Sequence, residues 1–252
     1  MQIALPDPSK RYPQDAEWCV AEIDGEWREI RFHDYSDIYA VEGLYERLFY
    51  DLLECDSPAF VRSLLAAELE AADTPADRLR VLDLGAGNGI MGEQLVELGV
   101  ESVHGVDIIP EAAKAAERDR PHVYAEYHVV DLTRLPPPTR ESLAGANFNC
   151  LTCVAALGFG DIPPAAFHTA YNLVQTGGWV AFNIKEDFLD GADRSGFAAL
   201  IADSVDEGLL DVHARERYRH RLSTAGEPLH YVAMVGTKAG DMPPELLNGS
   251  SA

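Results

Sequence analysis

Hydrophobic and polar residues alternate over residues 18–32, and an Asp-Gly pair at 24–25 joins the two runs. Such a pair between alternating runs is a strong local signal for a β-hairpin. From residue 37 the hydrophobic spacing changes to three or four residues, which predicts an amphipathic helix over 37–54. Ser57 and Pro58 supply an N-cap and a first-turn proline, so they predict the start of a second helix.

From residue 79 onward, short apolar runs alternate with segments of helical spacing. This order is typical of an α/β fold in which a mostly parallel sheet carries helices on both faces. The last two runs, 209–221 and 229–237, indicate an antiparallel pair that closes the sheet. We therefore expect three parts, listed here as an N-terminal hairpin and helical cap over 1–77, a main domain over 78–240 and a flexible tail over 241–252.

Composition narrows the choice of partners. Hydrophobic residues make up 47% of the 252 residues and the formal net charge is −22, so most of the surface repels phosphate backbones and anionic lipid. No apolar run approaches the roughly 20 residues of a membrane span, and the first residues lack the apolar core of a signal peptide. Four cysteines in so long a chain fit a reducing compartment. We expect a cytoplasmic protein that acts on a small molecule, without nucleic acid or membrane, and the sequence leaves its oligomeric state open.

A glycine turn after the first strand of the main domain is the most informative segment. Gly85, Gly87 and Gly89 alternate directly after an apolar run, where backbone without side chains lets a ligand approach closely. The dinucleotide fingerprint places its third glycine at the position of Ile90 here. Asp83 also ends the strand with a carboxylate that repels a pyrophosphate and suits a cationic ligand. A nicotinamide dehydrogenase is therefore disfavoured.

Two further acids end the next two strands. Asp107 follows the glycine turn at the distance where a carboxylate accepts both ribose hydroxyls in this fold class, and Asp131 ends the third strand within reach of an adenine amino group. The carboxyl ends of parallel strands form the edge at which open α/β sheets bind ligands. Asp83, Asp107 and Asp131 are therefore expected to share one binding edge.

On these residues the chain resembles the class I S-adenosylmethionine-dependent methyltransferases of the small-molecule type, over residues 79–190. The segment 173–178 is similar to the family's Leu-x-Pro-Gly-Gly turn, with Thr176 in place of the proline. The resemblance implies a Rossmann-like, doubly wound, seven-stranded sheet that is mostly parallel with an antiparallel last strand. It also implies S-adenosyl-L-methionine as cofactor and S-adenosyl-L-homocysteine as product.

The same resemblance assigns cofactor contacts. Gly85, Ala86 and Gly87 would contact the methionine part within the turn that Gly89 completes, and Asp83 would lie near its ammonium group. The ribose would bind Asp107, and the adenine would contact the residues Ile108, Asp131 and Leu132. The methyl donor would be lined by the backbone from Cys153 to Ala155. An aromatic residue of the N-terminal part would close over it, with the candidates Tyr35, Tyr39 and Tyr45.

The catalytic residue is not fixed by the sequence. Methyl transfer is an in-line displacement that needs a base only if the nucleophile is protonated. Candidate bases are His168, Asp161 and the group Lys185, Glu186 and Asp187, while His33 to Tyr35 form a lid or merely end the hairpin. Cys150 and Cys153 point to opposite faces of a strand and are expected in the core, so no metal site is expected. The alternating arginines from 215 to 221 are expected to form a solvated strand face.

The leading hypothesis is therefore a methyltransferase that acts on an unidentified small molecule by in-line displacement. The alternative is a non-catalytic module that binds S-adenosylmethionine and engages a protein partner through residues 1–77, where acids outnumber bases.

Overall fold

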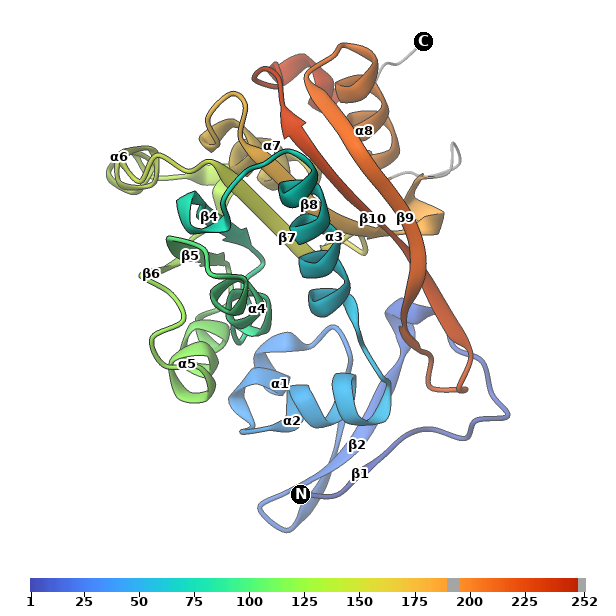
Figure 1. The fold of residues 1–252 in the computed structure, drawn as a ribbon. Helices are drawn as coiled ribbons and strands as arrows, with labels where there is room; N and C mark the ends of the chain where they lie inside the picture. The colour runs from blue at the N-terminus through green and yellow to red at the C-terminus, as the bar shows by residue number, and fades with distance from the viewer. Residues whose placement is uncertain (190–194, 249–252) are drawn as a thin grey trace.

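The computed structural model describes residues 1–189 and 195–248, and it contains a three-stranded and a seven-stranded sheet (Figure 1). The order of the larger sheet is β6-β5-β4-β7-β8-β10-β9. Its strands are β4 (Arg80–Leu84), β5 (Ser102–Asp107), β6 (Glu126–Val129), β7 (Cys150–Leu157), β8 (Trp179–Lys185), β9 (Leu210–Leu222) and β10 (Pro228–Lys238). All neighbours from β6 to β8 pair in parallel, whereas β10 is antiparallel to both β8 and β9. The expected seven strands and antiparallel closing strand are confirmed.

Helices cover both faces of this sheet, as expected. They are α3 (Ser57–Ala71), α4 (Ile90–Leu98), α5 (Pro110–Asp119), α6 (Pro137–Gly145), α7 (Pro164–Leu173) and α8 (Phe197–Asp206). Because side chains alternate along a strand, neighbouring residues of β7 enter different cores. Leu151 and Cys153 pack with Phe167 of α7, and Cys150 packs with Val61 of α3 on the other face. The expected core position of both cysteines is confirmed.

The N-terminal residues form a smaller unit with its own core (Figure 1, blue). Strands β1 (Ile3–Ala4), β2 (Trp18–Ile23) and β3 (Glu26–Arg31) make the three-stranded sheet. Asp24 and Gly25 both have positive φ, at 54° and 82°, as a tight two-residue hairpin turn requires. The expected hairpin is confirmed.

The single helix expected over 37–54 is wrong. The structure has α1 (Tyr35–Ala40), α2 (Leu44–Glu46) and a π-helical segment, η2 (Arg47–Leu52). Gly43 lies between them with φ of +70°, a left-handed conformation that interrupts helical hydrogen bonding. The hydrophobic period continues across this break, because the separate pieces bury the same face in one core that includes Ile38, Leu44 and Leu48.

The next helix begins differently from the expectation and belongs with the sheet. Asp56, not Ser57, is the N-cap of α3, and the buried Ser57 hydroxyl lies 2.6 Å from both the Tyr218 hydroxyl and His220 Nδ1. Val61 and Leu65 share a core with residues of β7, β8 and β10, the strands that α3 packs against. Residue 77 is therefore too late as a boundary. We call residues 1–56 the N-terminal unit and the described residues from 57 to 248 the sheet domain.

The end of the sheet domain is packed through Leu247. A short 3₁₀ helix, η6 (Pro244–Asn248), follows Met242, and Met242 and Leu246 are buried against the α7–α8 core. The expected flexible tail over 241–252 is wrong for this part, and residues 249–252 lie outside the described residues. Within the described ranges, no helix has both the length and the apolar character that a bilayer span requires.

Candidate active site

A cavity of about 280 Å³ lies where β4, β5, β6 and β7 end. This is the point at which the strand order reverses between β4 and β7, the usual ligand crevice of a doubly wound sheet. Of the expected cofactor contacts, the cavity wall includes Tyr39, Gly85, Asp107, Ile108, Asp131 and Leu132, and from the expected stretch 153–155 it includes Val154 and Ala155. Five others stand outside the wall, namely Asp83, Ala86, Gly87, Gly89 and Cys153. The structure thus brings two of the three strand-end acids to one cavity.

Gly85 forms the floor of this cavity with backbone alone. Its φ is +72°, and a Cβ on it would lie 2.8 Å from both Ala156 Cβ and Ile162 Cδ1. The amides of Gly85 and Ala86 both donate to the Val106 carbonyl, which fixes the turn to the end of β5. A side chain at Gly85 would clash, so the glycine is required by close packing as well as by its backbone conformation.

Asp107 is held by backbone donors on both of its oxygens. Oδ2 accepts from the amide of Gly87 at 3.0 Å, and Oδ1 accepts from the amide of Ile109 at 2.9 Å. Burial raises the pKa of Asp107, and the amide hydrogen bonds oppose this shift. The carboxylate therefore enters the cavity in a fixed orientation with unused acceptor capacity.

Asp131 has a different environment on the same edge. Its Oδ1 accepts from the hydroxyl and the amide of Thr133, and these hydrogen bonds lower its pKa below the usual range. Leu132 beside it is buried, whereas Ile108 leaves 58% of its surface exposed. The carboxylate of Asp131 is thus a solvated acceptor next to two apolar wall residues.

Asp83 lies behind the glycine turn, away from the cavity. It is 1% exposed, and its two oxygens accept from the Thr152 and Tyr124 hydroxyls at 2.7 and 2.8 Å. Burial is the main cause that raises the pKa of Asp83 to about 6. Each oxygen keeps an unused lone pair, and the expectation that Asp83 lies near a ligand ammonium group stays a prediction.

Three tyrosines of the N-terminal unit form the opposite wall of the cavity. The rings of Tyr35 and Tyr39 stack at 6.1 Å, and those of Tyr39 and Tyr45 lie 5.0 Å apart. The Tyr39 hydroxyl covers the glycine turn so closely that a Cβ on Gly87 would lie 2.5 Å from it. Burial raises the pKa of all three phenols, so they stay neutral and act as hydrogen-bonding groups rather than bases.

His33 and Asp161 form an acid–imidazole pair in the same cavity. His33 Nδ1 lies 2.9 Å from Asp161 Oδ2, and both residues also line an adjoining cavity of about 30 Å³. Since an ionised carboxylate only accepts hydrogen bonds, Nδ1 carries the proton and Nε2 is the basic nitrogen. Asp161 was a candidate from the sequence, but its partner was missed. The only sequence signal for this partner was a histidine at the end of the predicted hairpin.

The other candidate bases do not reach the cavity. His168 on α7 donates from Nε2 to the Met242 carbonyl at 2.9 Å, which is a packing role. Lys185 pairs with Asp187 at 2.6 Å, and Glu186 pairs with Arg217 at 3.0 Å. None of these candidates lines the wall.

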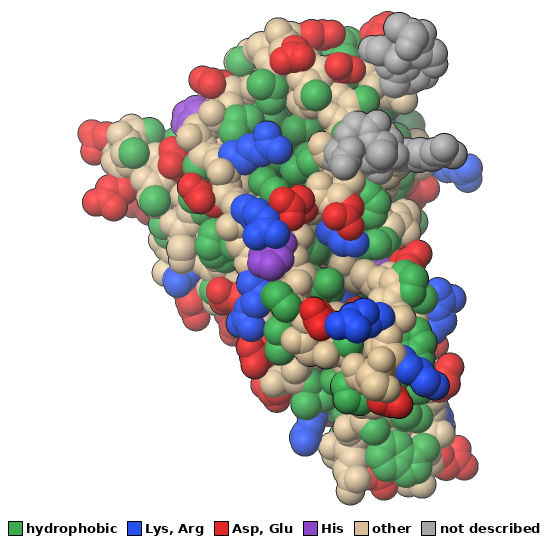
Figure 2. Space-filling view, turned by 90° about the vertical axis from the view of Figure 1, so that its right-hand side faces the viewer, with side chains coloured by type: hydrophobic (Ala, Val, Ile, Leu, Met, Phe, Trp, Pro, Cys, Tyr) green, Lys and Arg blue, Asp and Glu red, His purple; other side chains and the backbone are tan. Residues whose placement is uncertain are grey.

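Three arginines of β9 form ion pairs with acids from other segments. Arg219 pairs with Glu54 at 2.7 Å, and Arg221 pairs with the buried Glu17 at 2.6 Å. Figure 2, which views the molecule from the side of β9, shows basic and acidic side chains intermixed rather than a continuous basic area. The expected solvated face is confirmed at Arg217 and Arg219, but it is wrong at Arg221, which is buried.

Comparison with known proteins agrees with this architecture. Residues 58–226 match the family model for a methyltransferase domain. A ubiquinone biosynthesis O-methyltransferase from Paraburkholderia phymatum is 32% identical over 104 residues, which are 41% of this chain and 43% of that protein. One from Thiobacillus denitrificans is 31% identical over the same shares. The chain thus spans less than half the length of these curated relatives.

Solved structures show the same fold at low identity. The N-methyltransferase NodS from Bradyrhizobium japonicum, solved with S-adenosyl-L-homocysteine, aligns with a TM-score of 0.54 and 12% identity, covering 82% of this chain and 97% of that one. Magnesium protoporphyrin IX methyltransferase from Synechocystis gives 0.53 and 15%, covering 81% and 97%. The family match spans the glycine turn, both cavity acids and Asp161, and it confirms the resemblance found in the sequence. The chain belongs to the methyltransferase domain family.

Proposed function

We propose that this protein transfers a methyl group from S-adenosyl-L-methionine to a hydroxyl group of a small, largely apolar molecule. The observation that carries the proposal is the His33–Asp161 pair at 2.9 Å in the cavity that Gly85 and Asp107 also line. A base is needed for methyl transfer to a hydroxyl, because the nucleophile carries a proton at neutral pH.

The strand-end side of the cavity fits the cofactor. Asp107 offers carboxylate acceptors for a ribose diol, and Asp131 offers one for an adenine amino group. Ile108 and Leu132 supply the apolar surface on which the adenine would lie. The backbone of Gly85, which lies in the cavity wall, would contact the methionine part. When bound, this cofactor supplies a methyl group activated by a positively charged sulfur.

The side formed by the N-terminal unit fits the acceptor. Asp161 holds the imidazole of His33 in one tautomer, so that Nε2 takes the proton of an acceptor hydroxyl. The tyrosines shield the site from water and orient the acceptor for in-line attack. The adjoining cavity, with Phe32, Phe49 and Phe159 in its wall, extends this side with aromatic surface. A phenolic acceptor suits such a wall, and the ubiquinone biosynthesis relatives support the choice.

The pairing of some N-terminal acids within the chain favours the enzyme over the non-catalytic alternative, since Glu46 pairs with Arg120 at 2.6 Å and Glu54 with Arg219 at 2.7 Å. His33 is the candidate base that a methyltransferase acting on a hydroxyl needs. The net charge of −22 remains the reason to propose a small molecule rather than a nucleic acid as acceptor.

Calorimetric titration with S-adenosylmethionine and S-adenosylhomocysteine tests the cofactor half. We expect Asp107→Ala to weaken binding about 100-fold or more, because two charge-assisted hydrogen bonds are lost. Asp131→Ala, at the solvated position, is the matched variant, and we expect a loss of about tenfold. Product detection by mass spectrometry over a panel of phenols then tests the acceptor half. The proposal is contradicted if the wild-type protein binds neither compound, or if only amines or thiols in a parallel panel are methylated.

A further inference from the structure

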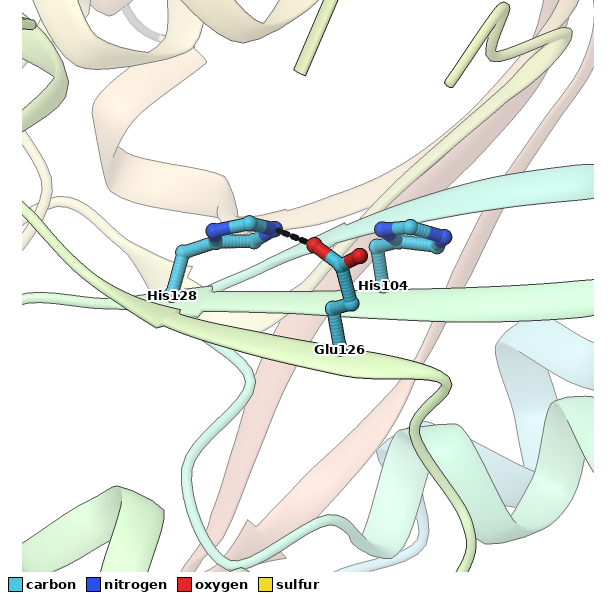
Figure 3. A group of neighbouring side chains, drawn as sticks. All are labelled: His104, Glu126 and His128. Atoms are coloured by element: carbon cyan, nitrogen blue, oxygen red, sulfur yellow. Dashed lines mark ion pairs between the residues drawn. The ribbon is translucent and has the colours of Figure 1, made fainter. Parts of the chain in front are cut away.

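Three side chains of the two outermost parallel strands converge outside the cavity (Figure 3). His104 belongs to β5, and Glu126 and His128 belong to β6. In the register of this pair, His104 lies opposite Glu126 and Val106 lies opposite His128, so all three side chains project from one face. One nitrogen or oxygen atom from each lies within 4.8 Å of the others.

Two imidazole nitrogens at this point lack a hydrogen-bond partner. His104 Nδ1 and His128 Nε2 are both removed from solvent and have no partner among the described residues. His128 Nε2 lies 3.2 Å from Glu126 Oε2, the pair marked in Figure 3, without the geometry of a hydrogen bond. Buried polar atoms nearly always have a hydrogen-bond partner or a bound ion. Two unpartnered nitrogens beside one carboxylate therefore indicate that a further group binds here.

We propose that His104, Glu126 and His128 bind a first-row divalent cation such as Zn²⁺. Two neutral imidazoles and a carboxylate are a ligand set that this ion uses, with water in the fourth position. Bond lengths of about 2.0–2.2 Å require the ligand atoms to approach more closely than they do now. Glu126 has the freedom to provide that movement, since 56% of its side chain is exposed.

The site has a structural role, because it ties the edge of the sheet together. β6 is a four-residue strand at the end of the sheet and pairs only with β5 in the strand order. The His104 ring packs edge-on against Phe148, with the ring centroids 5.2 Å apart, so one ligand is anchored in the core. None of the three ligands lines the cavity, although β5 ends at Asp107 and β6 leads to Asp131. The cation would therefore stabilise the strand ends without taking part in methyl transfer.

The test is a titration of the metal-stripped full-length protein with Zn²⁺ against a chromophoric chelator. We expect one ion per chain, and a loss of affinity of about 100-fold or more for His104→Asn and for His128→Asn, since even outer-shell changes cost 10- to 100-fold. His230→Asn, on β10 in a different part of the sheet, is the control and should leave the affinity unchanged. Zn²⁺ should also raise the melting temperature of the wild type and the control, but not of the ligand variants.

Glu126→Gln keeps the test decisive if a histidine variant fails to fold, because the Glu126 side chain is half exposed and contributes little to the core. It should lower Zn²⁺ affinity at least about tenfold with an unchanged circular dichroism spectrum. The proposal is overturned if Zn²⁺ does not bind at micromolar concentration, or if it binds equally to the wild type and all three ligand variants. S-adenosylmethionine binding is measured separately on the metal-free protein, so a failure of this site is distinguishable from a failure of the proposed function.

Discussion

On one side of the cavity, Gly85, Asp107 and Asp131 stand at the ends of neighbouring parallel strands, each close in sequence to the next. On the other side, His33 and Tyr39 come from a separate N-terminal unit with its own core. The first side is placed by the topology of the sheet, since carboxyl ends of parallel strands share an edge. The second is placed only by the docking of one unit on another.

In the proposed function, the strand-end side binds the cofactor and the docked side acts on the acceptor. The strand-end side carries backbone amides and carboxylates in fixed positions, such as Asp107 between two amide donors. The docked side carries the proposed base His33, the aromatic wall and the surface that an acceptor would contact. A methyltransferase that keeps the first side and changes the second could keep its cofactor and change its substrate.

The largest effect is expected at His33. His33→Gln should lower kcat by about 10²- to 10⁴-fold, the usual contribution of a positioned base, and change S-adenosylmethionine affinity by less than about threefold. Steady-state kinetics with the acceptor found in the phenol panel, together with calorimetry, separates the two quantities. His168→Gln is the control, because that imidazole donates to the Met242 carbonyl outside the cavity. An unchanged kcat for His33→Gln would remove the base from the mechanism.

The strand-end side could be predicted from sequence because its signals are local. The glycine turn and Asp107 lie within 23 residues, and each follows directly after an apolar run that predicts a strand. The surroundings of Asp83 could not be predicted, because the pattern that places an acid at a strand end does not show which hydroxyls will cover it. Thr152 and Tyr124, which accomplish this, come from other strands and loops.

The docked side could not be predicted in the same way. His33 and Asp161 are 128 positions apart, and no periodicity links a hairpin end to a loop after β7. The helix break at Gly43 was also hidden, because hydrophobic spacing records which face is buried and not whether the backbone stays helical. The proposed metal ligands on β5 and β6 could not be predicted from sequence. They are brought together by the pairing register of the two strands, and neither strand's sequence alone determines this register.

The next effect is expected at the buried ion pair between the two parts. Arg221 donates to Glu17 Oε2 at 2.6 Å, with the side chains 4% and 1% exposed. Glu17→Gln leaves the Arg221 charge buried without its partner, so the free energy of unfolding should fall by about 3–5 kcal/mol. Urea unfolding measures this loss, and hydrogen exchange should increase in β2 more than in β4. A loss below about 1 kcal/mol would mean that the apolar contacts alone hold the N-terminal unit.

A smaller effect, dependent on pH, is expected at Asp83 on the strand-end side. Its pKa of about 6 in the folded protein exceeds the ordinary value of 3.8, so folding favours the protonated form. The stabilisation from this group is complete below the ordinary value and is lost as the pH rises through about 6. Over that interval the free energy of unfolding should fall by about 3 kcal/mol relative to Asp83→Asn, which does not titrate. Urea unfolding of both proteins from about pH 4 to pH 7 checks the slope, and parallel curves would contradict a buried, titrating Asp83.

The smallest effect is expected at Arg219, whose ion pair with Glu54 also joins the two parts. These side chains are 44% and 54% exposed, so water and salt screen the pair and its contribution should be about 0.2–1 kcal/mol. Arg219→Gln should therefore be nearly neutral in urea unfolding, and added salt should remove the remaining difference. Both ion pairs join β9 to the N-terminal unit, so the two pairs differ mainly in burial. A loss at Arg219 as large as at Glu17 would show that surface charge, rather than the buried pair, docks the unit that carries His33.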